Sequence, residues 1–156
     1  MSGHEVLGHE ELHVRRGRRT GLHVVVAVHS TALGPALGGA RLWRYDAPGD
    51  AIADALRLSQ AMTYKAAAAG LDLGGGKSAL CAPATLPAER RRDLMLDLGD
   101  AVEALEGLYV VAEDDGTTTQ DKTAVAERTT HVVGLPPERG GSGDPSPVTA
   151  RGVEAA

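Results

Sequence analysis

The stretch Met62-Thr-Tyr-Lys-Ala-Ala-Ala-Ala-Gly-Leu-Asp-Leu-Gly-Gly-Gly-Lys77 joins a helical pattern to a glycine-rich loop and then to a short apolar segment. Upstream of it, Pro48 to Ala69 carries apolar residues at helical spacing, and Gly70 is placed to end the helix. Downstream, Lys77 to Ala82 is typical of a short buried strand. A helix that passes into a strand in this way indicates an α/β domain.

Strand and helix patterns alternate along the rest of the chain. Leu22 to Val28 is a nearly continuous run of Val and Leu, which is typical of a buried strand, whereas glycines and a proline predict a loop from Ser30 to Gly39. Further strands are expected at residues 12–16, 41–45, 109–112 and 131–134, and further helices at 86–105 and 118–128. This order predicts a three-layer α/β/α domain with a mostly parallel sheet, in which ligands bind beyond the carboxyl ends of strands.

Composition narrows the function classes. The chain has 156 residues, of which 42% are hydrophobic and 24% charged, as in a globular protein, and its net charge of −5 argues against a nucleic-acid or anionic-membrane partner. The single cysteine, Cys81, fits a reducing compartment, and the polar start from Met1 to Val14 is not that of a signal peptide. No apolar run approaches the ~20 residues of a membrane span. We therefore expect a cytoplasmic protein.

The spacing of the glycines matches neither a phosphate-binding P-loop nor a dinucleotide-binding motif. Gly70 to Ser78 resembles a phosphate-binding P-loop, but its first glycine is one residue too early and the loop precedes a strand instead of a helix. No Gly-x-Gly-x-x-Gly occurs, so no residue of this chain is predicted to bind a dinucleotide. The six histidines show no paired ligand spacing, and no metal site is predicted.

Three charged residues, Lys65, Lys77 and Asp114, are the best candidates for chemistry. A lysine held among Ala, Leu and Gly is desolvated, and a neighbouring cation acts in the same direction, so both lower its pKa. Such a lysine can act as a general base near neutral pH, while a lysine that stays charged can bind a carboxylate. Asp114, at the end of a predicted strand, could move protons. Spacing alone leaves a second interpretation open, in which the lysines extend to solvent and Asp114 caps the next helix.

These residues lie within motifs that resemble the leucine/valine/phenylalanine branch of the amino acid dehydrogenases. The motifs cover the chain from about Leu22 onward: His29-Ser-Thr-Ala-Leu-Gly-Pro-Ala-Leu-Gly-Gly-Ala-Arg41, Asp54-Ala-Leu-Arg57, Met62-Thr-Tyr-Lys-Ala-Ala-Ala-Ala-Gly70, Leu73-Gly-Gly-Gly-Lys77, Ala112-Glu-Asp114, Gly116-Thr-Thr118 and Gly140-Gly-Ser-Gly-Asp-Pro-Ser-Pro147. The resemblance implies oxidative deamination of a branched-chain or aliphatic L-amino acid to its 2-oxo acid and ammonia, with NAD as cofactor.

The resemblance also implies roles for individual residues. It assigns the substrate carboxylate to Lys65, the activation of water to Lys77, and proton exchange with the amino group to Asp114. It further implies that the substrate-binding cleft is lined by Gly38, Gly39, Leu37, Met62 and Ala112. Two positions depart from the family pattern: Asp115 adds a carboxylate that could raise the pKa of Asp114 or point away, and Lys122 stands at a usually apolar position.

The expected organisation is an N-terminal segment at 1–21, the substrate-binding and catalytic domain at 22–135, and a Gly/Pro-rich linker with the start of a helix at 136–156. Family members continue into a Rossmann-type domain that binds NAD, which this chain lacks, so the chain alone is expected to be inactive. The alternative is a stand-alone module that binds amino acids or 2-oxo acids without catalysis. Relatives assemble through this domain, which makes a homo-oligomer plausible.

Overall fold

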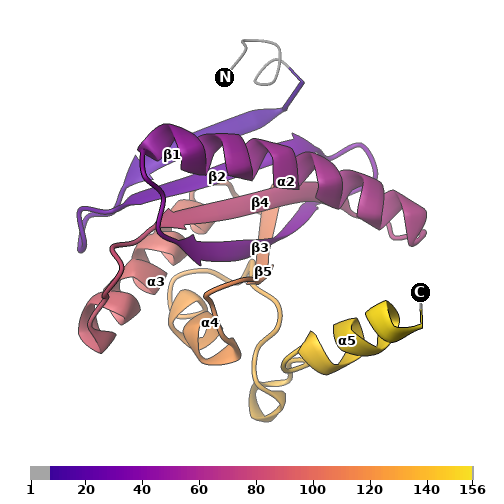
Figure 1. Cartoon of the computed structure of the whole chain (residues 1–156). Helices are drawn as coiled ribbons and strands as arrows, with labels where there is room; N and C mark the ends of the chain where they lie inside the picture. The colour runs from indigo at the N-terminus through magenta and orange to yellow at the C-terminus, as the bar shows by residue number, and fades with distance from the viewer. Residues whose placement is uncertain (1–7, 156) are drawn as a thin grey trace.

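A five-stranded sheet lies between one long helix and two shorter ones (Figure 1). The computed structural model describes residues 8–155. Its strands are β1 (Glu11–Arg16), β2 (His23–Ser30), β3 (Ala36–Trp43), β4 (Gly74–Cys81) and β5 (Tyr109–Glu113), in the order β1-β2-β4-β3-β5. Its helices are α2 (Pro48–Ala68), α3 (Ala88–Glu103), α4 (Thr119–Val125) and α5 (Ser146–Glu154), with a 3-10 turn at Pro137–Arg139.

The directions of the strands confirm the predicted α/β class and add one detail. β3 pairs in parallel with β4 and with β5, whereas β2 is antiparallel to both of its neighbours, β1 and β4. The sheet is therefore mixed, with β2 as its reversed strand. β1, which belongs to the predicted segment 1–21, is an edge strand of the same sheet.

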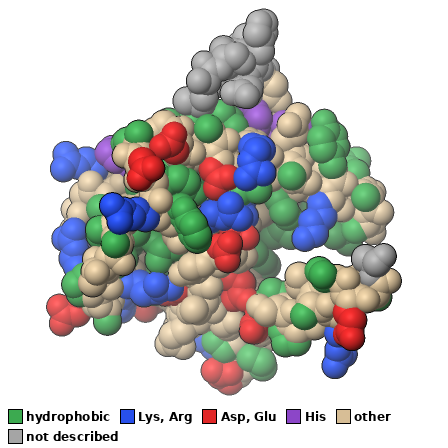
Figure 2. Space-filling view, viewed as in Figure 1, with side chains coloured by type: hydrophobic (Ala, Val, Ile, Leu, Met, Phe, Trp, Pro, Cys, Tyr) green, Lys and Arg blue, Asp and Glu red, His purple; other side chains and the backbone are tan. Residues whose placement is uncertain are grey.

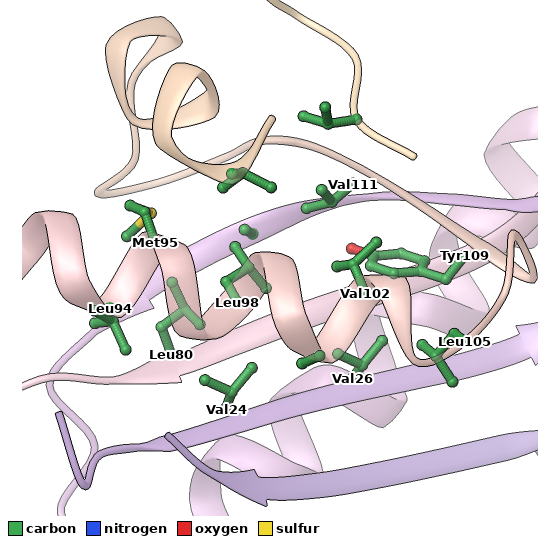
Figure 3. Packing of buried hydrophobic residues seen from close by; sticks show 14 of the residues in the cluster. Val24, Val26, Leu80, Leu94, Met95, Leu98, Val102, Leu105, Tyr109 and Val111 are labelled. Atoms are coloured by element: carbon green, nitrogen blue, oxygen red, sulfur yellow. The ribbon is translucent and has the colours of Figure 1, made fainter. Parts of the chain in front are cut away.

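The apolar core has two parts because helices cover both faces of the sheet. Val24 and Val26 of β2 face α3, where they pack with side chains such as Leu80, Leu98 and Tyr109 (Figure 3). The intervening Val25 and Ala27 face α2 and form a second cluster with Ala51, Ala55, Leu56 and Ala79. A strand that is buried on both faces needs apolar residues at every position, which explains the continuous run from Leu22 to Val28.

The glycine-rich segments are only partly loops: residues 31–35 form the predicted loop, but the glycines that follow it and those before Lys77 lie in strands, so that part of the prediction is wrong. Gly38 and Gly39 lie inside β3, and Gly74 to Gly76 begin β4. The reason is close approach of neighbouring segments. A Cβ on Gly75 would collide with the α2 backbone at Thr63, and a Cβ on Gly76 would lie 2.5 Å from the Tyr109 ring. The glycines therefore let α2 and Tyr109 pack directly onto β4.

Two smaller differences concern the second half of the chain. α4 is shorter than the expected helix at 118–128, and the expected strand at 131–134 is reduced to a single bridge between Val111 and Val132. The helix that the sequence expects to begin within 136–156 is α5, which starts at Ser146. Among residues 8–155, no helix combines the length and apolar character that crossing a membrane requires.

Candidate active-site cleft

A cleft of about 1130 Å³ opens between the sheet and α5, and Figure 2 shows the hollow beside α5 on one face of the molecule. α2 packs over β2 and β4, so it leaves the same face of β3 and β5 uncovered. The lining includes every residue that the sequence predicts for the site: Leu37, Gly38, Gly39, Met62, Lys65, Lys77, Ala112 and Asp114. Residues far apart in the sequence thus meet in one place.

Strand register brings the central residues to the same level. Ala40 pairs with Ser78 on β4 and with Glu113 on β5, so the preceding residues Gly39, Lys77 and Ala112 also lie side by side. A Cβ on Gly39 would lie 2.6 Å from the Asp114 Cβ. Glycine at this position therefore makes room for the Asp114 side chain against the sheet.

Lys77 and Asp114 form an ion pair at the floor of the cleft. The Nζ atom of Lys77 lies 2.8 Å from Oδ2 of Asp114, and only 5% of the Lys77 side chain is exposed. Nε of Arg41 donates to the same Oδ2 atom at 2.9 Å. No hydrogen bond from residues 8–155 reaches the other oxygen, Oδ1, so the carboxylate keeps one acceptor atom for a ligand.

The site lowers the pKa of both partners. Burial lowers the pKa of Lys77, the pairing with Asp114 opposes the change, and the positive charge of Arg41 lowers the pKa further. Burial alone would raise the pKa of Asp114, but Lys77 and Arg41 outweigh it and hold the pKa below its ordinary value. The neighbouring cation is thus Arg41, where the sequence suggests Lys65, and the pKa of Asp114 is lowered although Asp115 follows it in the chain.

A tight turn after β5 positions Asp114. Its backbone N–H donates to Oγ1 of Thr117 at 3.0 Å, and the Thr117 hydroxyl donates to the carbonyl of Ala40 at 2.8 Å. Gly116 has a φ of 77°, and a Cβ there would collide with the Leu42 carbonyl. The turn is therefore attached to β3, which fixes Asp114 relative to Gly39.

A second layer of charge, which the sequence analysis leaves without a role, surrounds the ion pair. Nη1 of Arg41 contacts Oδ2 of Asp54 at 3.0 Å, and Asp54 also accepts hydrogen bonds from Tyr45 and Arg57. The signal was present in the sequence: Arg41 is a charged residue in a predicted strand, and Asp54 lies close to the apolar stripe of a predicted helix. An ionised side chain so close to a core needs a partner.

The other predicted lysine, Lys65, is exposed at the C-terminal end of α2. It lines the cleft, and within residues 8–155 its amine forms no ion pair or hydrogen bond. The two lysines therefore differ in environment, one exposed and unpaired, the other buried and paired with Asp114.

Lys122, the unexpected lysine of α4, is fully buried on the opposite side of the sheet, where α4 packs against α3 and β5. Its Nζ atom has no hydrogen-bond partner among residues 8–155. Burial lowers its pKa to about 8, although the negative charges of Asp121, Glu113 and Asp114 act in the other direction. Lys122 does not line the cleft.

The glycine-rich segment from Gly74 to Gly76 has no room for a dinucleotide. Gly74 and Gly75 pair with β3, Gly75 and Gly76 pair with β2, and α2 packs directly on Gly75, so no backbone N–H groups or open space are left there for a pyrophosphate. Residues 8–155 also contain no group of three or more His, Cys, Asp or Glu side chains arranged to hold a metal ion.

Comparison with known proteins agrees with this geometry. The chain is 45% identical over 150 residues to a leucine dehydrogenase of Thermoactinomyces intermedius, a match that covers 96% of this chain and 40% of that protein. It is 47% identical over 147 residues to a valine dehydrogenase of Streptomyces virginiae, covering 94% and 40%. The crystal structure of an L-tryptophan dehydrogenase from Nostoc punctiforme matches with a TM-score of 0.74 and 34% identity, over 82% of this chain and 38% of that one.

The chain thus spans about 40% of the length of the leucine and valine dehydrogenases that it matches. A family model described as the Glu/Leu/Phe/Val dehydrogenase dimerisation domain matches residues 6–131, which is most of the chain. The chain therefore belongs to the Glu/Leu/Phe/Val dehydrogenase family, as a form of its N-terminal dimerisation domain.

Proposed function

We propose that this chain is the substrate-binding domain of an NAD-dependent L-amino acid dehydrogenase, which converts a branched-chain or aliphatic L-amino acid and water to the 2-oxo acid and ammonia. The observation that carries the proposal is the buried Lys77–Asp114 pair, with 2.8 Å between Nζ and Oδ2, at the floor of a cleft that Lys65 also lines. We assign to these three side chains the roles of base, proton acceptor and free cation around one space.

The three charged groups divide the work according to their environments. Lys65, exposed and unpaired, binds the substrate carboxylate. Lys77, whose pKa burial lowers, takes a proton from the water that attacks the imino carbon. Asp114, whose pKa Lys77 and Arg41 hold low in spite of its burial, accepts a proton from the substrate amino group. A general base and a proton acceptor of this kind each contribute about 10²–10⁴-fold in rate.

Apolar residues at the same cleft favour an aliphatic substrate. Leu37 and Ala112 lie on β3 and β5 and line the cleft, together with Met62 of α2 and the backbone of Gly38 and Gly39. A side chain that ends in a carboxylate would find no cation at Leu37 and Ala112. One methylene in such a pocket is worth only ~1–3 kcal/mol, so Leu, Val and Ile would be separated weakly.

NAD would accept the hydride, and we assign no residue of this chain to its binding. The relatives are longer than this chain, and their remaining length is where we place the dinucleotide site. The domain boundaries near residues 22 and 135 are part of the same proposal. The single half-buried thiol of Cys81 fits a cytoplasmic location.

We also propose that the chain forms a homo-oligomer, because its family model is described as a dimerisation domain. β1 is an edge strand of the described sheet and could pair with a second copy. Light scattering on the purified chain would then give at least twice the mass of a single chain. A mass of one chain at high micromolar concentration would reject the proposed oligomer.

Calorimetric titration of the purified chain with 4-methyl-2-oxopentanoate, the 2-oxo acid of leucine, tests the substrate site. We expect saturable binding at millimolar ligand, weaker binding of 2-oxoglutarate, and a loss of roughly tenfold in affinity in Lys65→Ala because a charge-assisted contact is removed. Arg57→Ala is the matched control, since it removes an exposed cation of the same helix that does not line the cleft. No heat of binding at millimolar ligand would overturn the proposal.

A further inference from the structure

Arg41 lies between two carboxylates that come from different parts of the chain. Its Nε atom donates to Oδ2 of Asp114 at 2.9 Å, and its Nη1 atom donates to Oδ2 of Asp54 at 3.0 Å. Only 22% of its side chain is exposed. The guanidinium therefore connects the turn after β5 to α2 across the open face of the sheet.

Asp54 is itself anchored, so it can hold Arg41 in one orientation. The Tyr45 hydroxyl donates to its Oδ2 atom at 2.9 Å, and Nη2 of Arg57 donates to its Oδ1 atom at 2.7 Å. These contacts keep the pKa of Asp54 below its ordinary value in spite of burial. A guanidinium held at both ends by carboxylates loses its freedom to rotate, which preorganises the group it contacts.

We propose that Arg41, oriented by Asp54, is a positioning residue that holds Asp114 as a carboxylate with Oδ1 directed to the cleft. The proposal rests on the proposed function of Asp114 as the proton acceptor. Oδ2 is shared by Lys77 and Arg41, whereas Oδ1 has no partner from residues 8–155, and Asp114 lines the cleft. The oxygen that remains free is thus the one that a substrate amino group can reach.

An arginine is suited to this place because Lys77 must change its charge. When Lys77 loses its proton to act as a base, it no longer neutralises Asp114. Arg41 stays protonated at any pH at which the protein is folded, so Asp114 keeps one permanent cation throughout. The same positive charge favours the loss of the proton from Lys77. One fixed charge therefore serves both groups, and a lysine could not contact both carboxylates with a planar fork.

The test is an NMR titration of carboxyl carbons in protein labelled with [γ-13C]aspartate, with the Asp114 signal assigned from Asp114→Asn. We expect the titration midpoint of Asp114 to rise by about one pH unit or more in Arg41→Gln, because a cation at 2.9 Å is lost. In Arg41→Lys the rise should be smaller. Arg44→Gln is the control: it removes an exposed cation next to Tyr45 that forms no ion pair with Asp114 or Asp54, and the Asp114 midpoint in this variant should stay within about 0.3 pH unit of the wild type.

An unchanged Asp114 midpoint in folded Arg41→Gln would overturn the proposal. If that variant does not fold, Asp54→Asn replaces it: releasing one end of Arg41 should raise the midpoint by a smaller amount, and no change would equally overturn the proposal. The titration uses no ligand, so it is independent of whether 2-oxo acids bind. If the 2-oxo acid binds but the Asp114 midpoint does not shift in Arg41→Gln, only the positioning role of Arg41 is rejected. If the midpoint shifts but no 2-oxo acid binds, only the substrate assignment is rejected.

Discussion

Lys77 and Lys122 are two buried lysines that the same sheet separates. Lys77 faces the cleft on the α2 side, where its amine lies 2.8 Å from a carboxylate oxygen of Asp114. Lys122 faces the α3 side and is fully buried, and its amine has no hydrogen-bond partner in the described part of the chain. Burial lowers the pKa of both, that of Lys122 to about 8.

The two lysines differ in their contacts and in their access to the cleft. Lys77 has an anion to stabilise its charged form and an open cleft in which a ligand can meet it. Lys122 does not line the cleft, and the nearby carboxylates of Asp121, Glu113 and Asp114 offset only part of the cost of burying its charge. A lowered lysine pKa alone therefore does not identify a functional residue in this protein. A lysine with a lowered pKa is a candidate for function when it also has a charged partner and access to a cleft.

The largest expected effect comes from removing the carboxylate that pairs with Lys77. Asp114→Ala leaves Lys77 and Arg41 facing each other without their shared anion, which should lower the free energy of unfolding by about 2–4 kcal/mol. Urea denaturation measures it. Asp115→Ala, which removes an exposed carboxylate next in the chain, should stay within about 0.5 kcal/mol of the wild type. Equal losses in the two variants would mean that the buried pair adds nothing.

The next effect has the opposite sign. Lys122→Met replaces an unpaired buried amine with an apolar side chain of similar length, so the free energy of unfolding at pH 7 should rise by about 1–3 kcal/mol. Lys65→Met is the control, because the Lys65 amine is exposed and its loss should change stability by less than about 0.5 kcal/mol. A destabilised Lys122→Met would show that the amine has a favourable contact in solution.

The gain from Lys122→Met should also depend on pH. The folded protein binds the Lys122 proton with a pKa of about 8, whereas the ordinary value is 10.5. Between these pH values the unfolded chain binds more protons, so the stability of the wild type rises with pH. The advantage of the variant is therefore complete below pH 8 and shrinks toward pH 10.5. A constant difference across this range would contradict the assignment of the lowered pKa.

The smallest effect is expected for Lys77→Met. Asp114 keeps Arg41 as a partner when Lys77 is lost, so the free energy of unfolding should change by about 1 kcal/mol or less. Comparison with Asp114→Ala in the same denaturation experiment makes the asymmetry visible. A cost as large as that of Asp114→Ala would mean that Lys77, and not the shared carboxylate, holds the site together.

Much of the fold follows from local sequence patterns. The apolar stripe of α2, the continuous run of β2 and the helix expected at 86–105, which is α3, are confirmed because each pattern reports burial directly. The glycines of β3 and β4 gave the wrong prediction. Glycine breaks strands in isolation, and only the approach of α2, Tyr109 and Asp114 explains its presence there.

The residues that line the cleft could be predicted from the sequence, but the side chains that pair with them could not. Motifs identified Lys65, Lys77 and Asp114, and the structure places all three around one cleft. The contact of Arg41 with Asp114 joins residues 73 positions apart, and such a pairing has no local signal. Lys122 departed from an apolar pattern, but only the packing of α4 decides whether such a lysine turns outward or stays buried.

A titration of [ε-13C]lysine by NMR, with and without 4-methyl-2-oxopentanoate, tests most directly whether Lys77, and not Lys122, lies at a substrate site. Both amines should titrate below the ordinary lysine pKa, with Lys122 near pH 8. A bound 2-oxo acid should raise the midpoint of Lys77, because its carboxylate adds negative charge to the cleft, and should leave Lys122 within about 0.2 pH unit. No ligand-induced change at Lys77, or an equal change at Lys122, would contradict the assignment of this cleft as the substrate site.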